Sequence, residues 1–338
     1  MAKTFIIAEA GVNHNGSVEL AKQLIDVAAN AGANAVKFQT FKTENLVSRG
    51  ASKAAYQVEG TDENETQFEM LKKLELDVDT HRELMQYSND RNILFLSTPF
   101  DHESIDLLNN LNIPIFKIPS GEITNLPLIR KIAQLNKKII LSTGMATMEE
   151  VAAAVQLITN SGTSKDKITV LHCNTDYPTP MLDVNLRAMI TIQEKFDIAV
   201  GYSDHTLGIE VPIAAVSLGA TIIEKHFTLD NSMEGPDHRA SLEPKELIEM
   251  IIAIRNIENA LGDGIKKPSS SELKNKIVAR KSIYLKTALS KGKILTEKDL
   301  IMRRPGEGIS PMDIENVVGA ELLRDVHKDA LLSWEDIK

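Results

Sequence analysis

The chain alternates short apolar runs with longer amphipathic stretches from about Lys3 to Gly264. The short runs are almost continuously apolar, a pattern typical of parallel strands that are buried on both faces. We therefore predict strands at residues 4–9, 34–39, 93–98, 115–120, 138–143, 168–173, 198–203 and 221–226.

The stretches between these runs carry apolar residues at helical spacing. They include 18–31, 80–90, 147–160, 183–195 and 207–217, and 243–261 follows the last strand. Strand and helix thus repeat eight times, which predicts an α/β fold of the (β/α)8 TIM-barrel type, with an open doubly wound sheet as the alternative. The polar interval 40–79 is longer than a barrel connection needs, and such loops are often lids or binding loops.

The character of the sequence changes after the barrel. Residues 266–276 (KKPSSSELKNK) are rich in Pro, Ser and Lys and have no apolar face, which indicates a linker. Short apolar runs then alternate with turn sequences such as RRPGEG, which predicts a small second domain of about 60 residues that is marginally stable alone. The predicted boundaries are 1–265 for the barrel, 266–276 for the linker and 277–338 for the second domain.

Composition narrows the class of protein. The 38 Lys and Arg residues face 47 Asp and Glu, giving a net charge of -9 without a basic stripe, which argues against nucleic-acid and anionic-membrane partners. No apolar stretch reaches the length of a membrane span, and the N-terminus lacks the features of a signal peptide. The single cysteine, Cys173, excludes an intramolecular disulfide framework, so we expect a cytoplasmic protein.

Polar residues end every predicted strand. Active sites of (β/α)8 barrels form at the carboxyl ends of the strands, so these side chains should meet in one polar mouth. They are Glu9, Lys37, Gln39, Thr98, Lys117, Ser120, Glu122, Ser142, His172, Asn174, Ser203, His205 and His226.

His205 and His226 end neighbouring strands and are the natural candidates for metal ligands. Adjacent strands lie about 4.8 Å apart, so both imidazoles can reach one ion and leave positions open for water and substrate. Such a site suits Mn, Zn, Fe or Co. The alternative is a pair of hydrogen-bonded barrel histidines, and His172 and Cys173 are assigned structural roles.

Lys37 and Lys117 lie within apolar strands, where a lysine needs an anionic partner or a lowered pKa. One interpretation is an ion pair inside the barrel, with Glu9 or Glu122. The other is capture of a phosphate or carboxylate, assisted by the serine hydroxyls at the neighbouring strand ends. Together these features favour an anionic small substrate.

Nine short motifs follow one another along the chain. They are AEAGVNHNG (8–16), VKFQT (36–40), STPFD (97–101), KIPSGE (117–122), LSTGMA (141–146), LHCNTDYPTP (171–180), GYSDHT (201–206), EKHFTLD (224–230) and GPDH (235–238). In this order they resemble the signature series of the sialic acid synthase family, which includes bacterial N-acetylneuraminate and N,N'-diacetyllegionaminate synthases. The C-terminal RRPGEGISP (303–311) resembles the antifreeze-like SAF domain of that family, a β-clip fold, so the resemblance covers essentially the whole chain.

The resemblance implies a metal-dependent transferase that condenses phosphoenolpyruvate with an N-acylated mannosamine-type sugar to a nonulosonic acid and phosphate. It implies His205 and His226 as metal ligands, with Mn2+ preferred and Mg2+ or Co2+ as alternatives, and Glu9 near the reacting centre. Either Glu9 or Glu122 would move protons. Phosphoenolpyruvate contacts are implied for Lys37, Thr98, Lys117, Ser120, Ser142 and Ser203, and sugar contacts for Gln39, Glu122, Tyr177 and Asp237.

Arg304 matches an arginine that the SAF domain of the partner subunit places over the acyl group of the sugar, which implies a domain-swapped homodimer. One position departs from the family pattern. Thr175 stands where some members have Asn, and Asn174 lies one step earlier, so that phosphoenolpyruvate contact stays open between them.

Other functions remain as alternatives. One is a Schiff-base lyase or aldolase with Lys37 or Lys117 as nucleophile. The other is a non-catalytic sugar-binding protein. The sequence does not identify the sugar, which could be N-acetylmannosamine or a 2,4-diacetamido-6-deoxy relative, and residues 40–79 and 184–189 are where discrimination is expected.

Overall fold

The computed structural model describes residues 3–338, which form two compact units. The first unit ends at Gly262, and the second comprises Asp263–Lys338. Each unit contains an apolar core of its own. No helix in the described range combines the length and apolarity that crossing a bilayer requires.

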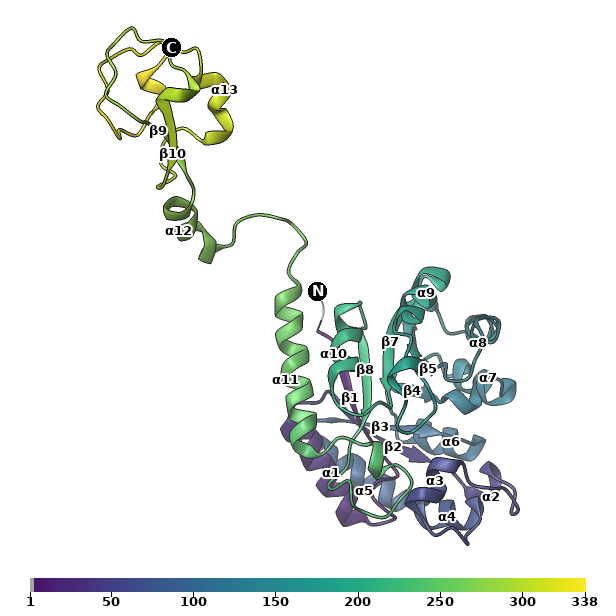
Figure 1. The fold of residues 1–338 in the computed structure, drawn as a ribbon. Helices are drawn as coiled ribbons and strands as arrows, with labels where there is room; N and C mark the ends of the chain where they lie inside the picture. Colours follow the sequence, from purple (N-terminus) through teal and green to yellow (C-terminus); the bar gives the residue numbers. More distant parts are fainter. Residues whose placement is uncertain (1–2) are drawn as a thin grey trace. The chain divides into compact units, whose positions relative to one another are not determined.

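The first unit is a barrel of parallel strands surrounded by helices (Figure 1). Hydrogen-bonded neighbours follow the order β3-β2-β1-β8-β7-β6-β5-β4, and the end strands β3 and β4 pack side by side, which closes the barrel. The predicted (β/α)8 fold is therefore confirmed. The strands are β1 Phe5–Gly11, β2 Ala35–Thr40, β3 Leu94–Pro99, β4 Ile115–Ile118, β5 Lys138–Ser142, β6 Ile168–His172, β7 Ala199–Asp204 and β8 Ile222–His226.

Helices that bury one apolar face cover the outside of the barrel. Side chains at their first turns cap them: Ser17 accepts from the Leu20 N–H, and Asp101 from the Ser104 N–H. α6 and α7 fill the two strand intervals for which no helical range was predicted. The helices are α1 Val18–Ala31, α5 Val78–Asp90, α6 His102–Asn110, α7 Leu126–Gln134, α8 Met148–Asn160, α9 Arg187–Phe196, α10 Glu210–Ser217 and α11 Pro244–Leu261.

The interval 40–79 contains short helices rather than an open loop. They are α2 Thr43–Leu46, α3 Ala55–Gly60 and α4 Gln67–Leu74. They lie over a small apolar cluster, separate from the barrel core, that includes Phe41 and Leu74. Packing on this cluster, together with the cap that Thr66 gives α4, holds the segment on the barrel.

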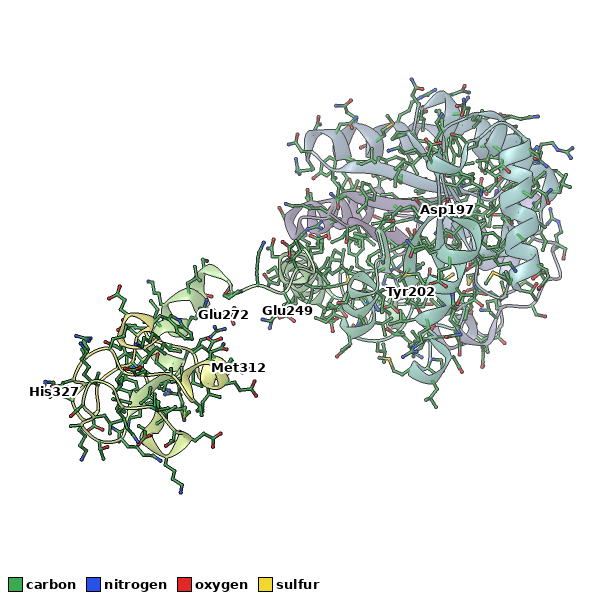
Figure 2. The ribbon with its side chains drawn as sticks, turned by 90° about the horizontal axis from the view of Figure 1, so that it is seen from above. Asp197, Tyr202, Glu249, Glu272, Met312 and His327 are labelled. Carbon is green, nitrogen blue, oxygen red and sulfur yellow. The ribbon has the colours of Figure 1, made fainter. Side chains whose placement is uncertain are left out.

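The second unit is small and rich in turns. It contains α12 Ser270–Ala279, the antiparallel strands β9 Ser282–Leu285 and β10 Leu300–Arg303, and α13 Ile314–Val317. The predicted linker 266–276 is exposed at every residue, and its second half is helical because it forms the start of α12. Figure 2 labels Tyr202, which is buried in the barrel, and Met312, which is exposed on the second unit.

Candidate active site

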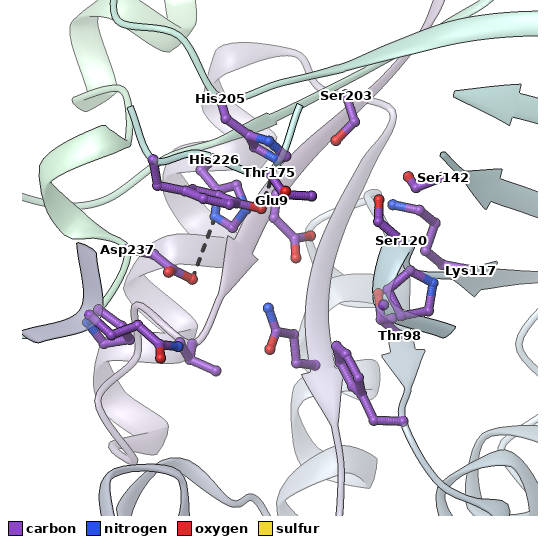
Figure 3. A pocket seen from close by; sticks show the side chains of 18 of the residues that line it. Glu9, Thr98, Lys117, Ser120, Ser142, Thr175, Ser203, His205, His226 and Asp237 are labelled. Carbon is purple, nitrogen blue, oxygen red and sulfur yellow. Dashed lines mark hydrogen bonds and ion pairs between the residues drawn. The ribbon is translucent and has the colours of Figure 1, made fainter. Parts of the chain in front are cut away.

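A cavity of about 320 Å³ opens at the carboxyl ends of the barrel strands, within the usual size range of small-molecule sites. The predicted polar mouth is thus a real feature of the fold, and Figure 3 shows its side chains converging. The sequence-predicted residues that line it are Glu9, Lys37, Gln39, Thr98, Lys117, Ser120, Ser142, Tyr177, Ser203, His205, His226 and Asp237.

Some predicted site residues do not line this cavity. Glu122 lies in a single turn of 3-10 helix after β4, which directs its carboxylate to the Asn125 side chain at 2.6 Å. The Asn174 side chain accepts a hydrogen bond from the Asp176 N–H at 2.8 Å, whereas Thr175 next to it does line the cavity. Arg304 follows β10 in the second unit, where it is exposed.

Each buried lysine of the cavity has a carboxylate partner. The Lys37 Nζ lies 2.8 Å from Glu9 Oε2 and donates to Thr98 Oγ1 at 2.9 Å. The Lys117 Nζ donates to Glu224 Oε1 at 2.6 Å. Of the two partners that the sequence suggested, Glu9 is therefore found in an ion pair and Glu122 is not.

Glu224 is a charged residue of the site that was not predicted from the sequence. Its Oε1 accepts from both Lys117 and the Ser203 hydroxyl, the latter at 3.0 Å. A signal was present, because side chains alternate along a strand and Glu224 lies two residues before His226 on the same inward face. Lys225 between them points outward, where it pairs with the buried Asp204.

The two glutamates have opposite pKa shifts. Burial, reinforced by the charge of Glu224, raises the pKa of Glu9 to about 7 although Lys37 counteracts it. Burial also acts to raise the pKa of Glu224, but Lys117 and Lys37 together outweigh it and hold that pKa well below its usual range. At neutral pH Glu224 is a permanent counter-ion, and Glu9 is poised to exchange a proton.

His205 and His226 lie close together at the other side of the cavity (Figure 3), with ring centroids 5.5 Å apart. Burial lowers the pKa of His205 to about 4 and holds that of His226 well below its usual range, so both rings are neutral at physiological pH. The His205 Nδ1 faces the backbone carbonyl of Asn174, which can only accept. His205 therefore carries its proton on Nδ1, and its Nε2 lone pair accepts a hydrogen bond from the Tyr177 hydroxyl at 2.9 Å, so Nε2 is the nitrogen with a lone pair for a cation.

These histidines fit a divalent cation. The His226 Nδ1 is buried without a hydrogen-bond partner among the described residues, and the Asp237 carboxylate lies 3.9 Å from it. Within residues 3–338 no cluster of three or more His, Cys, Asp or Glu side chains forms a metal site. The protein would thus supply two nitrogens, and water or substrate oxygens would complete the coordination.

Aromatic rings cover the histidines. Tyr177 stacks on His205 with a centroid separation of 4.0 Å, and Tyr56 stacks on Tyr177 at 4.9 Å. Tyr56 belongs to α3 in the interval 40–79, so this segment reaches the site, and its role as a lid or binding loop stays a prediction. No sequence motif had singled out Tyr56 itself.

Gly11, at the end of β1, lies close to the side chains of His226 and Gln39 in the site. Its φ is +54°, and a Cβ added there would lie 3.2 Å from His226 Cε1 and 3.5 Å from Gln39 Nε2. We expect Gly11→Ala to lose about 1–2 kcal/mol of stability from backbone strain and also to displace His226, lowering kcat/KM.

Gly32→Ala is the matched control, because Gly32 has a φ of +82° but nothing within 4 Å of an added Cβ. Urea unfolding should show a similar loss of stability for both variants, with activity falling only in Gly11→Ala. Equal activities in the two variants would contradict the close packing inferred at His226.

Comparison with known proteins covers both units. Residues 24–266 match the model of the NeuB family, and residues 280–338 match that of the SAF domain. The chain is 54% identical to the N,N'-diacetyllegionaminic acid synthase of Campylobacter jejuni, over 98% of this chain and 99% of that one. It is 47% identical to the synthase of the same name from Legionella pneumophila, over 99% and 94%.

A solved structure is also similar. The crystal structure of the N-acetylneuraminic acid synthetase from Leptospira borgpetersenii, in complex with citrate, superposes with a TM-score of 0.71. The two sequences are 37% identical, and the match covers 81% of this chain and 90% of that one.

Proposed function

The chain belongs to the NeuB family, and we propose that it joins phosphoenolpyruvate to an N-acylated mannosamine-type sugar, releasing phosphate and a nonulosonic acid. The two relatives named for N,N'-diacetyllegionaminic acid favour that product, made from the 2,4-diacetamido-6-deoxy sugar. The observation that carries the proposal is one cavity with buried lysines on one side and neutral histidines on the other. A cytoplasmic location is proposed as well, since Cys173 is buried and unpaired.

Phosphoenolpyruvate is assigned to the lysine side. Lys37 and Lys117 would bind its phosphate and carboxylate as charge-assisted donors, and Thr98 already holds the Lys37 ammonium in place. Ser120 and Ser142 face the same side of the cavity in Figure 3. Since the Ser142 hydroxyl is buried without a partner among the described residues, it is available to a bound anion.

The aldehyde end of the sugar is assigned to His205 and His226. A divalent cation bound there, which we propose to be Mn2+, would act as a Lewis acid on the aldehyde oxygen. The backbone carbonyl of Asn174 keeps the His205 ring in the tautomer that such binding needs. Asp237, whose pKa is raised to about 6 by burial, borders this end and is assigned to sugar hydroxyls.

The reaction follows from these positions. C3 of phosphoenolpyruvate attacks the aldehyde carbon, the aldehyde oxygen takes up a proton to become the new hydroxyl, and positive charge develops at C2. Water adds to C2 and gives up one proton, which replaces the proton taken by the aldehyde oxygen. The bond between C2 and the phosphate oxygen then breaks, the C2 hydroxyl becomes the ketone, and its proton leaves with phosphate. Glu9 is held by Lys37 on the floor of the cavity, where its carboxylate would stabilise the charge at C2 and take the proton from water.

The first test is release of phosphate from phosphoenolpyruvate, with each candidate sugar, in EDTA and with added Mn2+. We expect release that requires the 2,4-diacetamido-6-deoxy sugar and stops in EDTA. A Schiff-base lyase would instead remain active in EDTA and form a pyruvate adduct that borohydride traps. Such an adduct on Lys37 or Lys117 would overturn the proposal.

We propose that Arg304 acts on the site of the partner subunit in a homodimer. Arg304 is exposed and makes no ion pair within residues 3–338, whereas its neighbour Arg303 pairs with Asp329 at 2.5 Å. Arg304 is thus the arginine of this turn that is available to a substrate. Arg304→Ala should raise the KM for the sugar, and Arg303→Ala should leave it nearly unchanged.

Mixing two impaired variants, assayed at a sugar concentration well below the KM of Arg304→Ala, distinguishes action within a subunit from action across a dimer. After unfolding and refolding together, Lys117→Met and Arg304→Ala chains form heterodimers in which one site has both intact residues. Activity should recover to about a quarter of the native value for random pairing. No recovery, with heterodimers shown by mass spectrometry, would mean that Arg304 serves its own barrel or none.

A further inference from the structure

One side of the cavity is apolar. We call it the apolar wall, and it is built by side chains from the loops after β1, β2 and β3 and from α4. Its residues are Val12, Leu46, Val47, Met70, Leu71 and Phe100. They belong to the cluster beneath the interval 40–79, but Phe41 and Leu74 of that cluster do not line the cavity. The wall is therefore the part of this cluster that the protein leaves open to a ligand.

The barrel order fixes where the wall lies relative to the chemistry. His205 and His226 follow β7 and β8, and β1, β2 and β3 come next around the barrel. Lys117 and Ser142 lie on β4 and β5, and Lys37 and Thr98 lie within β2 and β3, whereas the wall residues follow the ends of β1–β3 or belong to α4. If the sugar C1 lies at the histidines and phosphoenolpyruvate is held by the lysines within the barrel, the wall lies beyond the strand ends, where the far end of the sugar can extend.

The wall carries no strong hydrogen-bonding group, because its one heteroatom is the weakly accepting thioether sulfur of Met70, and the amides of Gln57 and Gln67 line the cavity outside the wall. A methyl group placed against the wall exchanges water for apolar contact, which is favourable, whereas a hydroxyl there loses its water partners and gains little in return. The two candidate sugars differ in this respect at C6, because one ends in a methyl group and the other in a hydroxymethyl group.

We propose that the apolar wall binds the C6 methyl group of a 6-deoxy sugar and thereby selects it over its 6-hydroxylated counterpart. This inference rests on the proposed condensation, and it names residues of the interval 40–79 as determinants of specificity. Val47 and Met70 are the two whose replacement changes polarity with little change of shape.

The test compares two 2,4-diacetamido mannose-type sugars that differ only at C6, one with a methyl and one with a hydroxymethyl group. With the native enzyme, kcat/KM should favour the methyl sugar by about tenfold to a hundredfold, the range that an apolar pocket achieves against an added hydroxyl. Val47→Thr and Met70→Gln place a polar atom in the wall and should each reduce this ratio by about fivefold. Because the ratio is taken within one variant, a general loss of activity cancels.

Val58→Thr is the matched control, since Val58 lies in α3 of the same interval but is exposed and does not line the cavity. Its ratio should equal that of the native enzyme. If neither sugar supports phosphate release, the proposed function itself is wrong. If both sugars react equally well, or if neither wall variant changes the ratio, the proposed condensation is retained. The proposal that the wall distinguishes the substituents at C6 is then wrong. If the preference depends instead on the N-acyl group of the sugar, the wall binds the methyl group of that N-acyl substituent and not the C6 methyl group.

Discussion

Lys117→Met should lower kcat/KM for phosphoenolpyruvate by about 10²–10³-fold, because it removes a buried cation that we assign to binding this anion. The Lys117 ammonium is 2.6 Å from Glu224 and lies on the same side of the cavity as Ser120 and Ser142. Methionine keeps most of the volume and none of the charge. Steady-state kinetics and calorimetric titration with phosphoenolpyruvate measure the loss.

The same substitution should also destabilise the fold, since it leaves the Glu224 carboxylate with Lys37 alone, 3.6 Å away. Removing one partner of a buried ion pair costs about 3–5 kcal/mol. The double variant Lys117→Met/Glu224→Gln removes the unpaired charge, so it should regain much of that stability and stay inactive. Recovery of activity together with stability would show that Lys117 is only a counter-ion.

Glu9→Gln should lower kcat by about 10²–10⁴-fold, the range expected when a proton-transferring group is lost. Glu122→Gln is the matched control, because Glu122 is the other carboxylate that the sequence offered and its side chain is held by Asn125 outside the cavity. Its kcat should remain close to that of the native enzyme. A large loss in Glu122→Gln with little loss in Glu9→Gln would reverse the assignment.

The pH profile of native enzyme and Glu9→Gln should differ around pH 7. As a base Glu9 must be ionised, so native kcat/KM should rise as pH increases through about 7, and the residual activity of Glu9→Gln should lack that limb. The contribution of Glu9 to the free energy of unfolding changes in the opposite direction and decreases as pH increases. The folded-state pKa lies above the unfolded value of 4.5, so the contribution of Glu9 is full below pH 4.5 and is lost as pH rises through 7. Urea unfolding at pH 5 and pH 8 should show that native protein loses more stability than Glu9→Gln.

The barrel and its mouth were predictable because strands buried on both faces leave a plain apolar signal and end at polar residues. Lys37 and Lys117 could also be identified from the sequence, because each places a charge inside one of these apolar runs and a buried charge requires a partner. Their partners were harder to assign. Glu122 follows β4, and the turn that points its carboxylate to Asn125 is set by local backbone geometry that no periodicity reports.

The structure of the interval 40–79, in contrast, could not be predicted from the sequence pattern. Its helices are so short that intrinsic propensity alone does not stabilise them, and the apolar residues of α2 and α4 pack in the cluster above the barrel. That packing builds the apolar wall, and Tyr56 of α3 stacks separately on Tyr177. Contacts of this kind depend on tertiary structure, so sequence indicated only that the interval matters.

The cluster of Lys37, Lys117, Glu9 and Glu224 is nearly electroneutral before any substrate arrives. The phosphate and carboxylate of an entering phosphoenolpyruvate therefore do not meet unpaired lysines. They exchange with the carboxylates of Glu9 and Glu224 as partners of Lys37 and Lys117. The displaced charge must be compensated, and Glu9, with its pKa of about 7, is the group that can take up a proton to do so. Binding of phosphoenolpyruvate thus becomes an acid–base event as well as a recognition event. The heat of binding should then depend on the ionisation enthalpy of the buffer, and affinity should strengthen toward the acid side, where turnover weakens.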